Sequence, residues 1–316
     1  MGKFGLADWQ EKPGRALLLG NGSSVAISSR FRYGSLLDAA GLTRNDLALF
    51  EHLRTVDFEE VLHCLHAARF VVGQTGGAPQ PIADRNSELR QKLVNAVDTH
   101  HVSRADALGT GVLQAWNVEL MKYASIFSTN YDLLLYWSIN QKSDQFVDFV
   151  FAGGFDEGNC VPFGSKRQVW WLHGGLHLYV DSTTGEVRKH VSTSTGSIQS
   201  LFSNAGTRSL FIAEGSSRQK RSRIRSKSYL ETAYQRLRDN HHELVVLGSQ
   251  LGPTDVHLVD AIKNSPCPGV LIGIYPSNQH HVTGEIGRFG GLFSTKKHEF
   301  FDSETHPLTD PKLNIP

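Results

Sequence analysis

The chain has 316 residues, which suits one large α/β domain or two small ones. Hydrophobic residues make up 40% and charged residues 20%, with 30 glycines and 11 prolines, and this balance excludes a disordered chain, a collagen-like fibre and a long coiled coil. With 32 basic and 31 acidic side chains the formal charge is +1, so the protein is not coated for non-specific nucleic-acid binding.

The cysteines and the apolar runs bound where the protein works. Cys64, Cys160 and Cys267 are far apart and form no CxxC pair, so neither a disulfide framework nor a four-thiolate zinc site is expected, and we expect no metal. No apolar run approaches the ~20 residues that cross a bilayer. The first fifteen residues also lack the continuous apolar segment of a signal peptide. We therefore expect a cytoplasmic protein that has no membrane partner.

Short apolar runs recur along the chain and predict strands. Runs of four to eight apolar residues are typical of strands buried on both faces, as in a parallel sheet. Amphipathic stretches at Tyr131–Asn140 and Lys227–Asn240 predict helices between them. The pattern predicts an α/β fold with a Rossmann-like, doubly wound, mostly parallel sheet. The predicted strands are Ala16–Gly20, Ile126–Thr129, Val147–Ala152, Val169–Leu172, Leu210–Ala213, Leu244–Gly248 and Val270–Tyr275.

Residues 35–122 have helical spacing almost throughout, interrupted by a loop at 73–81. A simple crossover needs only one helix, so this segment is predicted to be a helical insertion beside the carboxyl ends of the strands. The chain is then one domain over residues 1–316. Its nucleotide-binding core would consist of residues 16–34 and 123–280.

The first predicted strand runs into a glycine-rich turn. Glycines let the backbone approach a phosphate, and a following helix would point free amide groups at the anion. Val25 replaces the third glycine of the dinucleotide fingerprint, so a nucleotide-binding turn and a plain structural turn both stay open. The residues of this turn are Gly20, Asn21, Gly22, Ser23 and Ser24.

Three further strand ends carry polar side chains. Asn130 and Asp132 follow the second strand, as helix caps or as groups that hold a ribose. His173 follows a strand and precedes two glycines, so it is either a general base or a turn residue. Gly248 and Ser249 form a second glycine-containing turn, which would complete a dinucleotide crevice. A serine esterase is unlikely because the chain has no G-x-S-x-G elbow. Tyr275, at the end of a predicted strand, is expected in the core, with contact to an adenosine as the alternative.

Four motifs in chain order resemble sirtuins, and more closely the sirtuin-like NAD-hydrolysing effectors of bacterial anti-phage defence. The motifs are GNGSS at 20–24, STNYD at 128–132, LHG at 172–174 and GSQLGPTD at 248–255. Two further segments, YGSLLDAAG at 33–41 and FIAEGSS at 211–217, look like a poorly characterised bacterial branch of this group. The resemblance spans residues 16–275. The four-cysteine zinc module of sirtuin deacylases is missing, and Asn21 stands where sirtuins have a small residue.

The resemblance implies that NAD⁺ is the substrate and lies across the strand ends. Gly20, Asn21, Gly22 and Ser23 would hold the pyrophosphate and the neighbouring ribose. Asn130 and Asp132 would hold the nicotinamide-side ribose, with His173 as catalytic base. Gly248 and Ser249 would contact the adenosine half.

The activity implied is NAD⁺ glycohydrolase, yielding nicotinamide and ADP-ribose, in a toxic effector that depletes NAD⁺ during phage infection. A catalytically silent nucleotide-binding subunit and an NAD-dependent protein deacylase are the alternatives. Control would come from homo-oligomerisation or from a hexameric HerA-type ATPase partner, by analogy with related defence systems. The basic run Arg218–Lys227 is expected to be a solvated face, with nucleic-acid contact as the alternative.

Overall fold

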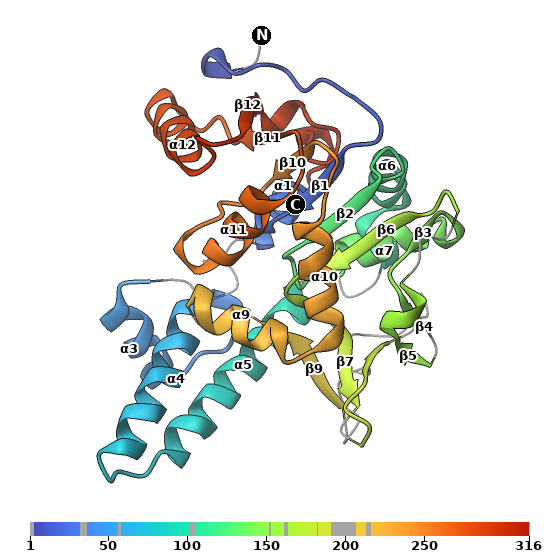
Figure 1. The fold of residues 1–316 in the computed structure, drawn as a ribbon. Coiled ribbons are helices and arrows are strands. Elements are labelled where there is room, and N and C mark those ends of the chain that lie inside the picture. The colour runs from blue at the N-terminus through green and yellow to red at the C-terminus, as the bar shows by residue number, and fades with distance from the viewer. Residues whose placement is uncertain are drawn as a thin grey trace.

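A computed structural model gives the fold shown in Figure 1. It describes residues 3–31, 37–55, 58–100, 105–151, 153–160, 164–181, 183–190, 207–212 and 216–315. Within these residues, no helix is both long enough and apolar enough to cross a membrane.

Seven parallel strands form the central sheet, in the order β12-β11-β10-β1-β2-β6-β3. The strand order reverses between β1 and β10, which makes this boundary the topological switch point of a doubly wound sheet. The predicted fold class is therefore confirmed. The strands are β1 (Ala16–Leu19), β2 (Ser125–Ser128), β3 (Phe146–Val147), β6 (Arg167–Trp171), β10 (Leu244–Leu247), β11 (Gly269–Ile274) and β12 (Lys297–Asp302).

Helices cover the sheet in two groups. One group pairs α6 (Thr110–Leu120) with α7 (Leu134–Asn140), and the other packs α10 (Ser228–Arg238) on α9 (Ser217–Arg225) and α11 (Val256–Asn264). The connections β1 to β2 and β10 to β11 run in opposite directions along the sheet. The right-handed crossover rule therefore places their helices on opposite faces. The remaining helices of the core are α1 (Asn21–Ile27) and α12 (Gln279–Leu292).

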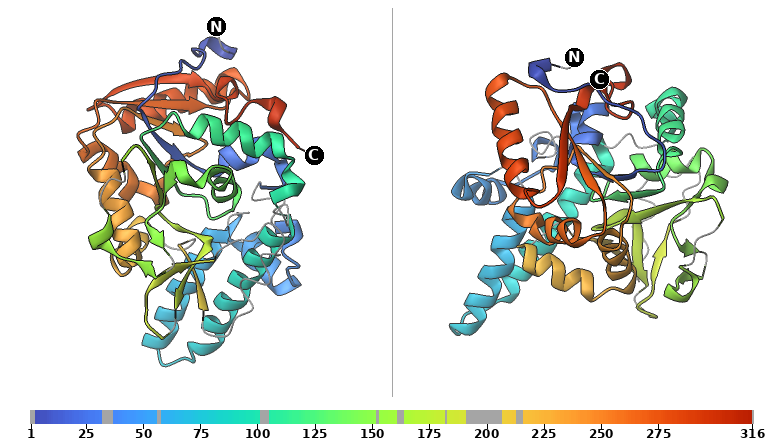
Figure 2. Two further views of the ribbon diagram at one scale, coloured as in Figure 1. Left: turned by 90° about the vertical axis from the view of Figure 1, so that its right-hand side faces the viewer. Right: turned by 45° about the horizontal axis from the view of Figure 1, so that its top comes forward.

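The segment between β1 and β2 is largely helical. It contains α3 (Arg44–Leu53), α4 (Phe58–Gln74) and α5 (Gln80–His100), ahead of α6. The helices α4 and α5 form an antiparallel hairpin that extends away from the sheet, as both views of Figure 2 show. Ion pairs from Asp46 to Arg85 and Lys92 fasten α3 to α5, because Asp46 is buried and needs cationic partners.

Two predicted strand assignments need correction, and one strand was not predicted. The run at 210–213 contributes β9 (Thr207–Phe211), which pairs antiparallel with β7 (Gly174–Asp181) outside the main sheet, and β8 (Val187–Lys189) pairs with the other edge of β7. The run at 147–152 divides into β3 and β4 (Val150–Phe151), with Phe149 between them at a φ of 60°. β4 pairs with β5 (Gly154–Phe155). β12 was not predicted and extends the sheet beyond residue 280.

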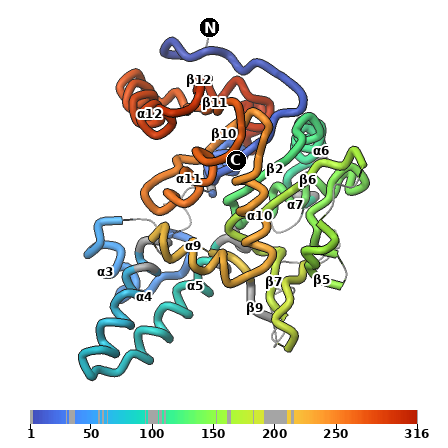
Figure 3. The backbone as a smooth tube through the Cα atoms, in the orientation of Figure 1, coloured from blue at the N-terminus to red at the C-terminus, as the bar shows by residue number. Residues whose placement is uncertain are grey.

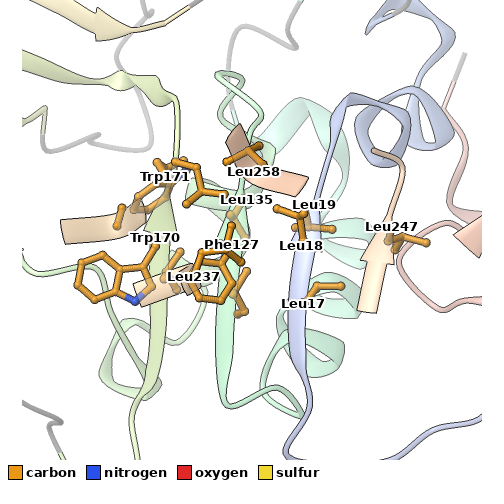
Figure 4. Close-up of a cluster of buried hydrophobic side chains, with 14 of the residues drawn as sticks. Leu17, Leu18, Leu19, Phe127, Leu135, Trp170, Trp171, Leu237, Leu247 and Leu258 are labelled. Atoms are coloured by element: carbon orange, nitrogen blue, oxygen red, sulfur yellow. The ribbon is translucent and has the colours of Figure 1, made fainter. Parts of the chain in front are cut away.

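The core lies on both faces of the middle strands (Figure 4). Leu17, Leu18 and Leu19 of β1 are fully buried beside Phe127 and Leu247 of the neighbouring strands. Helical leucines from α7, α10 and α11 pack against them. Each fully buried leucine contributes roughly 1.5–3 kcal/mol relative to an exposed one, so the ends of these strands rest on a rigid base.

Both ends of the chain are tied to the sheet region. Ala7 forms a parallel bridge with Phe301, and Figure 3 shows the blue N-terminal segment beside the red β12. The backbone amide of Ile315 donates to the carbonyl of Ile27 at 2.7 Å.

Candidate functional site

Asn130 and His173 lie at corresponding positions past the ends of two adjacent strands. Ser128 of β2 is paired with Trp171 of β6, and each candidate residue comes two positions later. The amide of Leu172 donates to the carbonyl of Ser128 at 2.8 Å, so the backbones stay together beyond the pairing. Neighbouring strands run about 4.8 Å apart, and the two residues therefore share the carboxyl edge of the sheet.

The two glycine turns at the switch point pack backbone against backbone. Gly248 has a φ of +68°, and a Cβ there would lie 2.2 Å from the amide nitrogen of Ser23. A Cβ on Gly20 would lie 2.5 Å from the Cα of Ser249, which is itself partly exposed. Gly22 donates its amide to the carbonyl of Gly248 at 2.8 Å. The close approach of the two turns accounts for all three glycines.

Several amides of the first turn are already used within the chain. Gly20 donates to the carbonyl of Leu247 at 2.9 Å, and Ser23 donates to that of Gly20 at 3.0 Å. The Asn21 side chain donates to the carbonyl of Phe31 at 3.0 Å. A phosphate bound here would have to use other donors of the turn than the amides of Gly20, Gly22 and Ser23 and the Asn21 side chain.

A buried hydrogen-bonded group surrounds Asn130, and we call Gly20, Ser23, Ser24, Asn130 and Asp132 the Asn130 cluster. The side-chain nitrogen of Asn130, Nδ2, lies 3.1 Å from the carbonyl oxygen of Gly20, 3.3 Å from Ser23 Oγ and 3.1 Å from Ser24 Oγ. Asn130 is buried, at 7% exposure, and its Oδ1 has no hydrogen-bond partner among the described residues. A buried acceptor without a donor is costly, so this oxygen is suited to accept a hydrogen bond from a ligand.

Asp132 is occupied by contacts within the protein. Its Oδ2 accepts from Ser24 Oγ at 2.5 Å, and its Oδ1 accepts from the amide of Leu134 at 3.0 Å. The second contact serves the first turn of α7. Asp132 thus positions α1 relative to α7, in addition to any contact with a sugar.

His173 belongs to a second group, the His173 cluster, formed by His173, Ser217, Lys220, Asp255 and His257. The two histidines and Lys220 are buried, whereas Ser217 and Asp255 are partly exposed. The Nε2 atoms of His173 and His257 are 3.2 Å apart, and His173 Nε2 lies 4.0 Å from Asp255 Oδ1. Lys220 Nζ donates to that same Oδ1 at 3.2 Å. Ser217 Oγ lies 3.1 Å from His257 Nδ1 and accepts from the backbone amide of His257 at 2.7 Å.

Burial keeps both histidines neutral. It lowers the pKa of His173 well below 6.5, and the nearby Lys220 ammonium lowers it further. Burial also lowers the pKa of His257 to about 3, with a smaller contribution from His173. Two neutral rings facing through Nε2 form a hydrogen bond only if one nitrogen donates and the other accepts.

Sequence reasoning missed the partners of His173. Lys220 was assigned to a solvated basic run, yet its side chain is 1% exposed. Lys220 and Ile224 are four residues apart and both face inward from α9, whose start is fixed by a capping box between Ser216 and Gln219. That spacing next to an apolar residue is the signal that could have placed Lys220 inside. His257 lies two residues after the GSQLGPTD motif, and no sequence pattern around it indicates a contact with His173.

Other predicted positions are more ordinary. Arg221 forms a bidentate pair with Glu231, and its guanidinium lies 3.9 Å from the centroid of the Tyr234 ring. Tyr275, expected in the core, is 56% exposed because β11 ends one residue earlier. Part of the FIAEGSS segment, including Glu214, lies outside the described residues.

Comparison with known proteins gives three results. A search of curated proteins finds no match. The chain is similar to a solved structure titled "Structural Basis for the Mechanism and Regulation of Sir2 Enzymes", at 10% identity and a TM-score of 0.35, over 96% of this chain and 91% of that one. A family model described as "Domain of unknown function (DUF4917)" matches residues 17–308, from β1 to beyond β12. The chain therefore belongs to the DUF4917 family.

Proposed function

We propose that the protein hydrolyses the N-glycosidic bond of NAD⁺, with Asn130 and His173 at the nicotinamide-side ribose. The observation that carries the proposal is the orphaned, buried Oδ1 of Asn130 at the carboxyl edge of the sheet, beside the switch point and level with His173. Nucleotides bind outside the carboxyl ends of strands at such points. A ribose hydroxyl is a donor that suits the unpaired oxygen of Asn130.

The chemistry asks little of the protein. The oxygen of a water forms a bond to the ribose C1′, and the bond from C1′ to the nicotinamide nitrogen breaks. The electron pair of that bond neutralises the pyridinium, which makes nicotinamide a good leaving group. One proton of the water passes to His173 and then to solvent. Asn130 orients the ribose or the water, which lowers the entropic part of the barrier.

A second candidate, nucleotide binding without turnover, is favoured by one specific contact. His173 Nε2 is 3.2 Å from His257 Nε2, and His173 is 3% exposed. A base held in this way must separate from His257 before its Nε2 can reach a substrate. The protein would then act as an assembly or sensor subunit, or as an enzyme that is latent until a partner opens the site.

The test is to incubate the purified chain with NAD⁺, with and without an acylated peptide, and to measure free nicotinamide and NAD⁺ binding. Nicotinamide without peptide supports hydrolysis, nicotinamide only with peptide indicates deacylation, and saturable binding alone indicates the second candidate. Asn130→Ala should remove turnover. Asn117→Ala is the matched control, because Asn117 is also buried and, among the described residues, its side chain donates to the carbonyl of Ser138, on α7.

The cellular role follows from the same proposal. An enzyme that depletes NAD⁺ would act as a toxic effector in anti-phage defence, held in check by oligomerisation or by a HerA-type ATPase. Expression of the chain should then lower cellular NAD⁺ and growth, whereas Asn130→Ala should not. Unchanged NAD⁺ levels during phage infection of cells that carry an active enzyme would contradict the defence role.

A further inference from the structure

His173, Asp255 and His257 bring three potential ligand atoms together inside the protein. These atoms all lie within 4.8 Å of one another, and both histidines are buried. The residues come from the end of β6, from the 3₁₀ turn at Pro253–Asp255 and from the start of α11. Their separation in sequence explains why no metal-ligand spacing is visible in the chain.

The distance between the two imidazoles fits a shared ion. A zinc–nitrogen bond is about 2.0–2.1 Å, so two nitrogens on one tetrahedral ion lie about 3.3 Å apart. His173 Nε2 and His257 Nε2 are 3.2 Å apart in the structure. Asp255 Oδ1 lies 4.0 Å from His173 Nε2, so the carboxylate has to move closer to complete a three-ligand set.

Ser217 supplies the outer contact that such a histidine needs. Its Oγ accepts from the backbone amide of His257 and lies 3.1 Å from His257 Nδ1. A proton on Nδ1 can be donated to this hydroxyl, which leaves the Nε2 lone pair directed at the cluster. Metal-binding histidines are commonly oriented by a hydrogen bond of this kind.

Lys220 opposes a metal ion at this site. Its ammonium is 3.2 Å from Asp255 Oδ1 and is buried, so it already neutralises the carboxylate. A divalent ion a few ångströms from an ammonium is strongly repelled. An ion can therefore enter only if Lys220 swings away from Asp255, and this residue sets the affinity.

We propose that His173, Asp255 and His257 form a binding site for one divalent transition-metal ion of the zinc, cobalt or ferrous type, with Lys220 as a built-in competitor. Two imidazoles and one carboxylate favour such ions over Mg²⁺ and Ca²⁺, which prefer all-oxygen sites. The site itself is independent of the proposed function. One consequence rests on that function: an ion bound to His173 Nε2 takes the lone pair that would accept the proton, and it therefore inhibits NAD⁺ hydrolysis.

The experiment titrates the full chain, first treated with a chelator, with Zn²⁺ by calorimetry and with Co²⁺ by visible absorption. We expect one ion per chain and the intense visible bands of low-coordinate Co²⁺. His257→Gln should abolish both signals, and Ser217→Ala should weaken binding about 10- to 100-fold. Lys220→Met should tighten binding at least about tenfold, because the repulsion is removed. His280→Gln, an exposed histidine on α12, is the control and should change nothing.

The proposed site would be wrong if the parent chain does not bind Zn²⁺. It would also be wrong if the His257→Gln variant still binds Zn²⁺. Equal affinity in the parent and Lys220→Met would overturn the competition. Circular dichroism checks the fold of each variant, and Ser217→Ala keeps the test valid if His257→Gln unfolds, because Ser217 is partly exposed. A chain that binds Zn²⁺ through these residues but never cleaves NAD⁺ would retain the site and lose the proposed function. The reverse result would remove the site alone.

Discussion

The Asn130 cluster and the His173 cluster lie at the same edge of the sheet but differ in how their polar groups are hydrogen-bonded. In the Asn130 cluster, the turn from β1 to α1 and the turn from β2 to α7 satisfy each other's hydrogen-bonding groups. Asn130 Oδ1 is left as a buried acceptor without a partner among the described residues. The His173 cluster gathers side chains from four separate elements and faces two neutral bases toward each other. The Asn130 cluster is thus a fixed scaffold with one acceptor that lacks a donor. In the His173 cluster, the two histidines have to separate before His173 Nε2 can accept a proton.

This difference predicts that turnover also falls steeply when the His173 cluster is changed. His173→Gln should lower kcat for NAD⁺ hydrolysis about 100- to 10,000-fold, the usual contribution of a general base. His177→Phe is the matched control, because His177 is also buried but lies outside the cluster, where it stacks on Tyr136 and meets Trp171 edge to face. Nicotinamide release measures both variants. Equal losses in the two would show that the effect is structural.

The scaffold character of the glycine turns can be tested through stability. Gly248→Ala should lower the free energy of unfolding by at least about 2 kcal/mol, because it adds left-handed strain and a clash with the Ser23 backbone. Gly284→Ala, at an exposed position of α12 with open space around it, should instead raise stability by about 0.4–1 kcal/mol. Urea unfolding compares the two. A harmless Gly248→Ala would mean that the two turns are not in contact.

Asp132 sharpens the comparison, since its carboxylate accepts hydrogen bonds from α1 and α7, while the ribose contact predicted for it stays a prediction. Asp132→Ala leaves the Ser24 hydroxyl and the Leu134 amide without their acceptor, at about 1–3 kcal/mol for each group left unpaired. We expect lower stability with an unchanged Kd for NAD⁺. A large loss of NAD⁺ affinity in a stable variant would show that Asp132 also contacts the ribose.

Histidines outside both clusters set a smaller, graded effect of pH. Burial lowers the pKa of His306 to about 3 and that of His177 well below 6.5. The unfolded chain therefore binds these protons first, and stability that is present above about pH 6.5 is lost as the pH falls, by up to about 1.4 kcal/mol per pH unit for each group. Neither ring nitrogen of His177 has a hydrogen-bond partner among the described residues.

His177→Phe should thus reduce the slope of stability against pH between 6.5 and 5, without loss of stability at pH 7. Denaturant titrations at several pH values measure the slope. An unchanged slope would show that His177 is already protonated or accessible to water in the folded chain.

How much the sequence could predict depends on how local each signal is. Each buried strand and the polar residue after it lie close together in the sequence. The parallel sheet and the position of Asn130 and His173 at its carboxyl edge could therefore be inferred. β12 was missed because only part of it is buried, as expected at a sheet edge, and its run KHEFFD is not continuously apolar. β9 was placed in the wrong sheet because an apolar run does not identify its partner strand. Lys220 and His257 could not be assigned to His173, because their contact is made by the packing of α9 and α11.

The position of β1 has a consequence for how the protein is made. This strand is synthesised before β10, one of its two partners, and His257 is added later still. We expect the nascent chain to lack an assembled site until at least residue 257 has left the ribosome, so shorter chains would have no complete site. Ribosome-bound chains that end before residue 244 should be digested readily by protease, whereas released chains should resist it.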